Sequence, residues 1–189
     1  MKIAITGNIG SGKSLVSNYL RSKDFYVFDC DAYNSELLEN NKDVFNEIYR
    51  EFPECIEHLR INKKKLAEIV FSDKDKKYTL ERITHPLIML KMLDESSKHE
   101  LFFAEVPLLY ELNFAKYFDL TILVVADKEI VSKRLLAKGY TQDQIDKRES
   151  FQLPVLYKVQ RADEIIYNND SYKDLYKEID RLLVKYDWE

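Results

Sequence analysis

The stretch Gly7-Asn8-Ile9-Gly10-Ser11-Gly12-Lys13-Ser14 decides the fold of this chain. It matches the pattern G-x-x-x-x-G-K-[ST], in which a glycine-rich turn wraps its backbone N–H groups around phosphate oxygens. Three of the four glycines in the 189 residues lie here, so a generally glycine-rich composition does not explain the match. An apolar run at residues 3–6 precedes the stretch, and a segment with one apolar face follows at residues 13–22. We therefore predict a loop that binds a nucleoside triphosphate; the alternative is a tight strand–helix turn without a ligand.

The same loop predicts the cofactors. The helix that follows such a loop points the positive end of its dipole at the bound anion. In loops of this type the lysine reaches the β- and γ-phosphates and the Ser hydroxyl holds Mg²⁺. We therefore expect a nucleoside triphosphate, either ATP or GTP, together with Mg²⁺, with Lys13 catalytic and Ser14 metal-binding. The expected ATP-binding residues of the loop are Gly7, Asn8, Ile9, Gly10, Ser11, Gly12, Lys13, Ser14 and Leu15.

Motifs that do not occur narrow the class of protein. A GTPase carries D-x-x-G for the γ-phosphate and N-K-x-D for guanine, and the chain has neither. An ATPase of the ABC type needs a second glycine-rich signature, but Gly139 is the one glycine outside the loop. A small-molecule kinase is the class that remains.

The composition indicates a globular protein. Hydrophobic residues make up 46% of the chain and charged residues 33%, which argues against disorder. The net charge of −4 lacks the basic excess of a duplex DNA binder, so we expect no nucleic-acid partner. The longest apolar run, residues 122–126, is far shorter than the roughly 20 residues of a membrane-spanning helix, and residues 1–7 lack the apolar core of a signal peptide. We expect a cytoplasmic monomer with no membrane partner, in which Cys30 and Cys55 are reduced thiols.

Strand and helix patterns alternate along the chain. The expected strands are residues 3–6, 25–28, 101–105, 120–125 and 164–167. The expected helices are residues 13–22, 127–138 and 172–186, with a mostly helical segment at 32–98 and a polar segment at 140–161. Pro53 and Pro86 should break the helical segment, and Asn62 or Lys63 should start a new helix.

This alternation predicts an α/β fold with a five-stranded parallel sheet flanked by helices on both faces. We expect a single domain over residues 1–189. Ligands of such sheets bind at the carboxyl ends of the strands, so the residues just after each strand are the candidates for chemistry.

Two aspartates follow the second expected strand, in the segment Asp29-Cys30-Asp31. A carboxylate near the γ-phosphate of a kinase orients the acceptor hydroxyl and accepts its proton. The alternative is that one aspartate caps the helix that begins near Ala32. The two roles can be shared between the two residues.

Seven short motifs lie in order along the chain. They are the phosphate loop, Asp29-Cys30-Asp31, His85-Pro86, Pro107-Leu108-Leu109-Tyr110-Glu111, Arg134-Leu135, Arg148 with Gln152, and Ala162-Asp163 with Ile166 and Asn168. Together they resemble the dephospho-CoA kinase family of P-loop kinases over residues 2–183. The resemblance implies the strand order 2-3-1-4-5, a helical acceptor-binding region at about residues 32–98 and a lid at about residues 139–161. The implied reaction is phosphorylation of the 3′-hydroxyl of dephospho-CoA by ATP, which gives coenzyme A.

The resemblance also implies roles for residues outside the loop. Asp31 is the implied base for the 3′-hydroxyl, and Arg148 of the lid is implied to contact the transferring phosphoryl group. The implied substrate-binding residues are Asp31, His85, Pro86, Pro107, Leu108, Leu109 and Glu111, and the further ATP-binding residues are Arg134, Arg148 and Asn168. The alternatives are a helix kink at His85, core packing for the two leucines, and exposed helix charges for the two arginines.

Three residues depart from the family pattern. Asn8 replaces the usual second glycine of the loop, and asparagine tolerates positive φ better than most residues. Lys138 replaces the second arginine of R-L-x-x-R, which keeps the charge but loses the bidentate geometry. Ser35 stands where many members carry Arg or His, so any contact made by that basic group is in doubt.

Two other functions compete with this interpretation. One is another small P-loop kinase, acting on a nucleoside monophosphate or on shikimate. Residues 32–98 contain only Arg50, Arg60 and Arg82, fewer than a monophosphate acceptor usually needs, and no run of glycines for shikimate. The other is a nucleotide-binding switch without turnover, which the departure at Asn8 alone supports.

Overall fold

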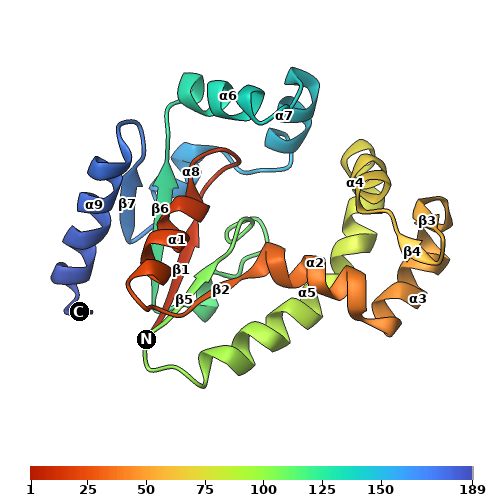
Figure 1. Cartoon of the computed structure of the whole chain (residues 1–189), viewed down its shortest axis with the longest axis horizontal. Helices are drawn as coiled ribbons and strands as arrows, with labels where there is room; N and C mark the ends of the chain where they lie inside the picture. The colour runs from red at the N-terminus through yellow and green to blue at the C-terminus, as the bar shows by residue number, and fades with distance from the viewer. Residues whose placement is uncertain (189) are drawn as a thin grey trace. The chain divides into compact units, whose positions relative to one another are not determined.

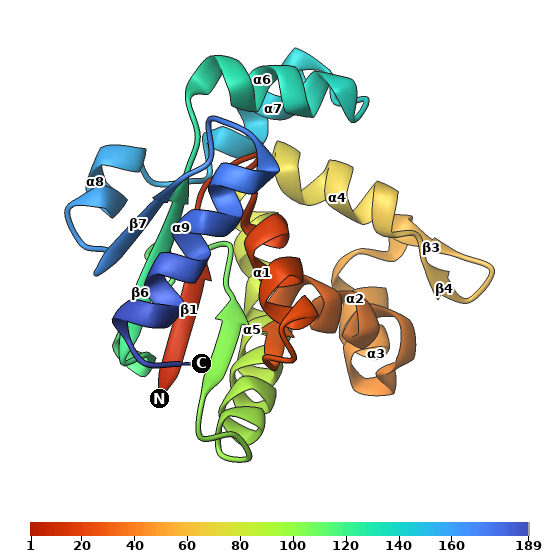
Figure 2. The same ribbon diagram turned by 60° about the vertical axis from the view of Figure 1, so that its left-hand side comes forward.

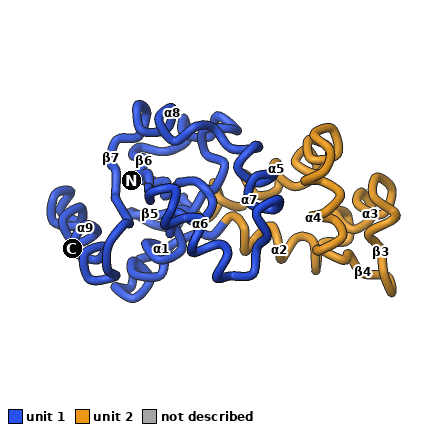
Figure 3. Tube along the Cα trace, turned by 90° about the horizontal axis from the view of Figure 1, so that it is seen from above, with its two compact units in different colours: residues 1–29, 96–189 blue, residues 30–95 orange. Residues whose placement is uncertain are grey.

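The computed structural model describes residues 1–188, which divide into two compact units. Unit 1 contains residues 1–29 and 96–188, and unit 2 contains Cys30–Glu95 (Figure 3). Unit 2 therefore forms one continuous piece of chain between two parts of unit 1. None of the helices in residues 1–188 has the length and apolar content needed to cross a bilayer.

Unit 1 is built on a sheet of five parallel strands among the described residues. These are β1 (Lys2–Thr6), β2 (Val27–Asp29), β5 (Phe102–Glu105), β6 (Leu120–Val125) and β7 (Glu164–Tyr167), in the order β2-β5-β1-β6-β7. Numbered by their place in the chain, the five strands have the order 2-3-1-4-5, as the resemblance implied. The central strand β1 is buried from Ile3 onward, so the loop that follows it starts from the core of the unit.

Helices cover the sheet of unit 1. They are α1 (Lys13–Ser22), α6 (Lys128–Ala137), α7 (Gln142–Glu149), α8 (Val155–Val159) and α9 (Tyr172–Lys185), with a short 3₁₀ turn at Ala115–Tyr117. Helices α1 and α9 lie side by side against the sheet, whereas α6 and α7 lie beyond the carboxyl ends of the strands (Figures 1 and 2). The core joins the apolar faces of β1, β6 and α9, and Trp188 closes it against Phe103 and Tyr186.

Unit 2 is helical with one small hairpin. Its elements are α2 (Cys30–Asn40), α3 (Lys42–Glu51), a 3₁₀ turn (Pro53–Cys55), β3 (Ile56–Glu57), β4 (Arg60–Ile61), α4 (Lys63–Ser72) and α5 (Lys74–Ser96). Asparagine side chains start two of these helices, because Asn41 accepts from the backbone N–H groups of Asp43 and Val44, and Asn62 from those of Lys64 and Lys65. The predicted start of a helix at Asn62 or Lys63 is confirmed.

Two local expectations were wrong, and two features were not foreseen. Pro86 does not break a helix but lies inside the 23-residue α5, where the hydrogen bonds of the flanking turns carry the helix past the missing N–H. The second strand covers Val27–Asp29 rather than residues 25–28, and α2 starts at the very next residue, so Asp29 ends a strand and Asp31 lies in the first turn of a helix. The β3–β4 hairpin was not expected. The polar segment 140–161 also contains two short helices, α7 and α8.

Both cysteines, Cys30 and Cys55, are buried free thiols.

Candidate functional site

The phosphate loop connects β1 to α1, and its glycines are required by the backbone. Gly12 caps α1 in the left-handed region, with φ of 101°, and a Cβ there would lie 2.0 Å from Asn168 Nδ2. A Cβ on Gly7 would lie 2.4 Å from the carbonyl oxygen of Val124. Within the described residues no side chain caps the first turn of α1. Its N–H groups therefore face the loop, where an anion can satisfy them.

Lys13 closes the mouth of the loop. Its Nζ donates to the backbone oxygens of Gly7 at 2.9 Å and Asn8 at 3.2 Å. These contacts bend the side chain back over the loop, so the ammonium lies beside the backbone of residues 7 and 8. Contact of Lys13 with phosphate stays a prediction.

Asn168 lies under the loop and fixes it. The side chain is 2% exposed, its Nδ2 donates to the Ser11 carbonyl oxygen at 2.8 Å, and its Oδ1 accepts from Arg134 Nη2 at 3.4 Å. The Nη1 of Arg134 is buried with no hydrogen-bond partner among residues 1–188. The structure therefore brings the loop, Asn168 and Arg134 together, and it leaves one donor of the arginine for a ligand. Contact of Asn168 with the base of ATP stays a prediction.

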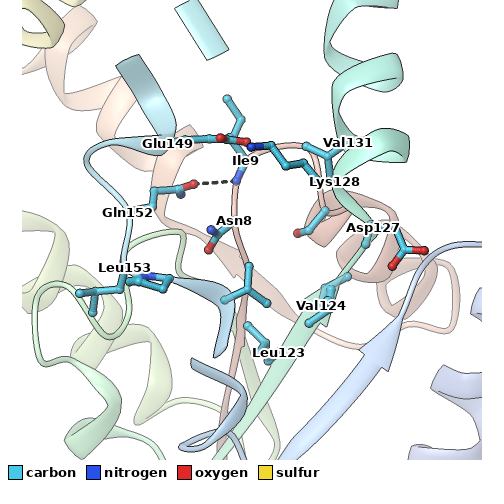
Figure 4. A pocket seen from close by; sticks show the side chains of 15 residues that line it. Asn8, Ile9, Leu123, Val124, Asp127, Lys128, Val131, Glu149, Gln152 and Leu153 are labelled. Carbon is cyan, nitrogen blue, oxygen red and sulfur yellow. Dashed lines mark hydrogen bonds between the residues drawn. The ribbon is translucent and has the colours of Figure 1, made fainter. Parts of the chain in front are cut away.

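The predicted lid is joined to the loop by a polar contact and an apolar cluster. Gln152 Oε1 accepts from the backbone N–H of Ile9 at 2.9 Å (Figure 4). The Ile9 side chain packs against a cluster of Val131, Leu135 and Ile145 from α6 and α7. A pocket of about 480 Å³ lies beside these contacts, and it is lined by the loop, the end of β6, the start of α6, Glu149 and residues 152–155. Arg148, the penultimate residue of α7, lies 5.2 Å from the ring centre of Tyr140, which belongs to the same cluster.

Glu111 connects the segment after β5 to the far end of the lid. Its Oε1 accepts from the Leu153 N–H at 2.8 Å and lies 2.7 Å from Nζ of Lys158, which is fully buried in α8. The Oε2 atom is buried with no hydrogen-bond partner among residues 1–188. Leu109 is fully buried, whereas Pro107 and Leu108 are half-buried. Acceptor binding by these residues stays a prediction.

The predicted residues of unit 2 lie on two helices. Asp31 is exposed in the first turn of α2. His85 and Pro86 lie in the middle of α5, where His85 follows the Lys77–Glu81 ion pair by one turn. Burial lowers the pKa of His85, with Lys77 acting in the same direction and Glu81 opposing it, so the imidazole is neutral at pH 7.

Magnesium is compatible with the donors at the loop. Residues 1–188 hold no group of three or more His, Cys, Asp or Glu side chains that could form a protein cage for a metal. Mg²⁺ usually keeps several waters and takes one or two protein ligands together with substrate phosphates. The Ser14 hydroxyl, on the first turn of α1, is a ligand of that kind.

Three contacts were not found by sequence reasoning. The sequence indicates each of these residues only weakly. Lys158 is a lysine inside the mostly apolar stretch Val155–Val159, and Gln152 and Asp163 are polar residues inside the motifs. Asp163 Oδ2 accepts from the backbone N–H and hydroxyl of Thr121 at 2.8 and 2.7 Å, so it joins the start of β7 to β6. The sequence pattern draws attention to these residues, but it does not predict their partners, which lie in distant parts of the chain.

Comparison with known proteins places this site in context. The family model described as "Dephospho-CoA kinase" matches residues 1–174. The dephospho-CoA kinase of Aquifex aeolicus is 34% identical over 96% of this chain and 95% of its own length. The dephospho-CoA kinase of Thermus thermophilus is 36% identical over 97% of this chain and 90% of its own.

Solved structures agree with these sequence matches. A crystal structure of a Thermus thermophilus protein superposes with a TM-score of 0.84 at 36% identity, covering 98% of this chain and 97% of that one. A dephospho-CoA kinase from Campylobacter jejuni superposes with a TM-score of 0.70 at 27% identity, covering 98% of both chains. A shikimate kinase from Acinetobacter baumannii, at 15% identity and a TM-score of 0.58, covers 100% of this chain and 95% of its own and shares the fold.

Proposed function

The chain belongs to the dephospho-CoA kinase family, and from this premise we propose that it transfers the γ-phosphoryl group of ATP to the 3′-hydroxyl of dephospho-CoA. The products are ADP and coenzyme A. The observation that carries the proposal is the family match over residues 1–174, which includes a phosphate loop with the required backbone geometry.

The loop supplies the binding site for the nucleotide. Backbone N–H groups at residues 12–14 would face the β-phosphate, and the Lys13 ammonium, which lies beside the backbone of residues 7 and 8, would contact the β- and γ-phosphates. Ser14 holds Mg²⁺, which offsets the charge of the phosphates when it is bound. Arg134 has one unused buried donor beside the loop, and it provides charge-assisted hydrogen bonds to phosphate oxygens.

Asp31 acts on the acceptor. An exposed carboxylate in the first turn of α2 orients the 3′-hydroxyl and accepts its proton as the phosphoryl group moves. Phosphoryl transfer depends mainly on positioning and on stabilisation of charge, so one well-placed carboxylate suffices. Arg148, at the end of α7, contacts the transferring group from the lid.

The protein works in the cytoplasm as a monomer under this proposal. Two buried thiols, Cys30 and Cys55, are compatible with a reducing compartment.

The test is ADP release from Mg-ATP with a panel of acceptors: dephospho-CoA, AMP, CMP, dTMP, shikimate and none. We expect stimulation by dephospho-CoA alone, with coenzyme A formed in equal amount. Stimulation by another acceptor would keep the fold and the phosphate loop and replace the substrate. Binding of ATP without stimulation by any acceptor would favour a nucleotide-dependent switch.

A further inference from the structure

One cation in unit 2 is held beside the proposed base. Lys63, the first residue of α4, donates from Nζ to Ser35 Oγ and to Glu39 Oε1, both on α2. We propose that Lys63 binds the 5′-diphosphate of dephospho-CoA and thereby makes the enzyme selective for an acceptor that carries phosphate. This proposal rests on the proposed function and adds a residue that determines acceptor specificity.

The position of Lys63 follows from the spacing along α2. Asp31, Ser35 and Glu39 are separated by four residues each, so they lie on one face of the helix, about 5–6 Å apart from one to the next. The Lys63 ammonium, bound to Ser35, therefore lies about one turn from Asp31. In dephospho-CoA the 3′-hydroxyl and the 5′-diphosphate branch from the same ribose ring. A hydroxyl held at Asp31 thus brings the diphosphate toward the cation one turn along the helix.

The hydrogen bonds of Lys63 leave it ready for a ligand. An ammonium group has three N–H donors, and Ser35 and Glu39 occupy two of them. The third has no partner among residues 1–188, and the side chain is 36% exposed. Because two anchors on α2 hold the ammonium in place, binding orders little additional side chain.

Glu39 does not neutralise the positive charge of Lys63 toward the diphosphate. Its side chain is 60% exposed, and exposed ion pairs of this kind contribute little, about 0–1 kcal/mol. A diphosphate carries more charge than one carboxylate and offers several acceptor oxygens, so it competes well for the third donor. Ser35 is neutral and short, and it holds the ammonium without adding charge.

Lys64 provides a matched control. It is the next residue of α4 and is exposed, and its side chain has no hydrogen bond or ion pair among residues 1–188. The variants Lys63→Ala and Lys64→Ala therefore remove the same charge from adjacent positions of one helix. A third variant, Lys63→Arg, keeps the charge and the donors.

The experiment measures steady-state kinetics for dephospho-CoA and the inhibition constant of adenosine against dephospho-CoA, since adenosine has the base and ribose of the acceptor but lacks its diphosphate. For Lys63→Ala we expect the KM for dephospho-CoA to rise about tenfold or more, since a hydrogen bond to a charged group contributes about 1.5–3 kcal/mol. The KM for ATP, the inhibition constant of adenosine and the thermal midpoint should stay within about twofold or a few degrees. Lys63→Arg should recover most of the affinity, and Lys64→Ala should behave as wild type.

Three results would overturn the proposal. The first is an unchanged KM for dephospho-CoA in Lys63→Ala. The second is an equal loss of affinity for dephospho-CoA and adenosine, which would mean that Lys63 only holds α2 and α4 together. The third is an equal effect of Lys64→Ala, which would make the effect one of general charge. If dephospho-CoA does not stimulate ADP release by the wild-type enzyme, the proposed function is refuted, and this inference with it.

Discussion

At the scale of single residues, the proposed chemistry depends on one carboxylate, Asp31. Asp31→Asn keeps the size and polarity of the side chain but removes the base, so kcat should fall by about 10²-fold or more, the usual contribution of general base catalysis. The KM for ATP should change little, because Asp31 is proposed to act on the acceptor, and the thermal midpoint should change little, because the residue is exposed. Kinetics with Mg-ATP and dephospho-CoA give the answer.

The control for that variant is Asp43→Asn. Asp43 is also exposed, also in unit 2, and also in the first turn of a helix, α3. It should turn over like the wild type. A normal kcat in Asp31→Asn would move the role to Asp29, the last residue of β2, whose carboxylate lies 3.8 Å from Arg21.

The backbone conformation at position 12 favours glycine over any other residue. In Gly12→Ala the new Cβ would meet Asn168 Nδ2 and the backbone would hold a left-handed conformation, so we expect a loss of about 2 kcal/mol or more in unfolding free energy. Chemical denaturation measures it. Gly139→Ala is the control, because Gly139 also has positive φ but a Cβ there meets nothing within 4 Å. It should cost only the backbone term, about 1–2 kcal/mol. Equal losses in the two variants would contradict a packing role for Gly12 against Asn168.

At the scale of elements, a buried ion pair ties the segment after β5 to α8. Lys158→Ala leaves the Glu111 carboxylate buried without its cation, so unfolding free energy should fall by about 3–5 kcal/mol. Lys158→Met together with Glu111→Leu removes both charges, and it should lose much less. Denaturant titration of the three proteins distinguishes these outcomes.

An exposed pair shows what the same kind of contact contributes in water. Lys177 pairs with Asp174 on α9, and the two side chains are 65% and 50% exposed. Lys177→Ala should cost no more than about 1 kcal/mol. A Lys158→Ala protein as stable as Lys177→Ala would show that Glu111 finds another partner.

The contact between β7 and α9 makes stability depend on pH. Burial acts to raise the pKa of Glu164, but hydrogen bonds from Lys185 and Tyr186 outweigh it, so the pKa lies below its usual 4.5. A carboxyl with a lowered folded pKa stabilises the fold above the unfolded pKa, and this stabilisation is lost as the pH falls through the folded value.

Glu164→Gln should therefore be less stable than wild type at pH 7, by about 1–3 kcal/mol, and the difference should shrink below about pH 4.5. Unfolding free energies measured from pH 7 to pH 3 test this. Glu178→Gln is the control, because Glu178 pairs with Arg181 on the same helix but is 46% exposed. A constant gap between wild type and Glu164→Gln across this range would be incompatible with the assigned ionisation.

Sequence patterns predicted some elements residue by residue and others not at all. The strands β6 and β7 have the predicted bounds, because each is a short apolar run with clear polar ends. The β3–β4 hairpin was missed, because His58 and Leu59 take positive φ at its turn where glycine or asparagine would have been the signal. The loop and the aspartate segment could be named from sequence, whereas the partners of Gln152, Glu111 and Lys158 depend on how distant segments pack.

At the scale of the whole molecule, nucleotide binding should stabilise the folded chain. At about 100 times its dissociation constant, Mg-ATP adds about 2.7 kcal/mol to the unfolding free energy, which raises the thermal midpoint by several degrees. Lys13→Ala should lose most of this shift while it keeps the midpoint of the free protein. Lys133→Ala, an exposed lysine of α6, should respond to Mg-ATP as the wild type does. An unchanged shift in Lys13→Ala would refute the assignment of Lys13 to the phosphates.

Unit 2 is one continuous segment of the chain, and this has a consequence for how the gene can evolve. The chain leaves unit 1 after Asp29 and returns at Ser96, and the strands on either side of this crossover, β2 and β5, are neighbours in the sheet. Asp31 and Lys63 are therefore encoded together on the continuous stretch for residues 30–95, whereas the loop proposed to bind ATP is encoded outside it. A recombination event that replaced this one continuous stretch of gene would exchange the proposed base, Lys63 and His85 together, and it would leave the phosphate loop and the segment at residues 107–111 unchanged. A new acceptor specificity would then arise from one exchange of this gene segment rather than from successive point mutations.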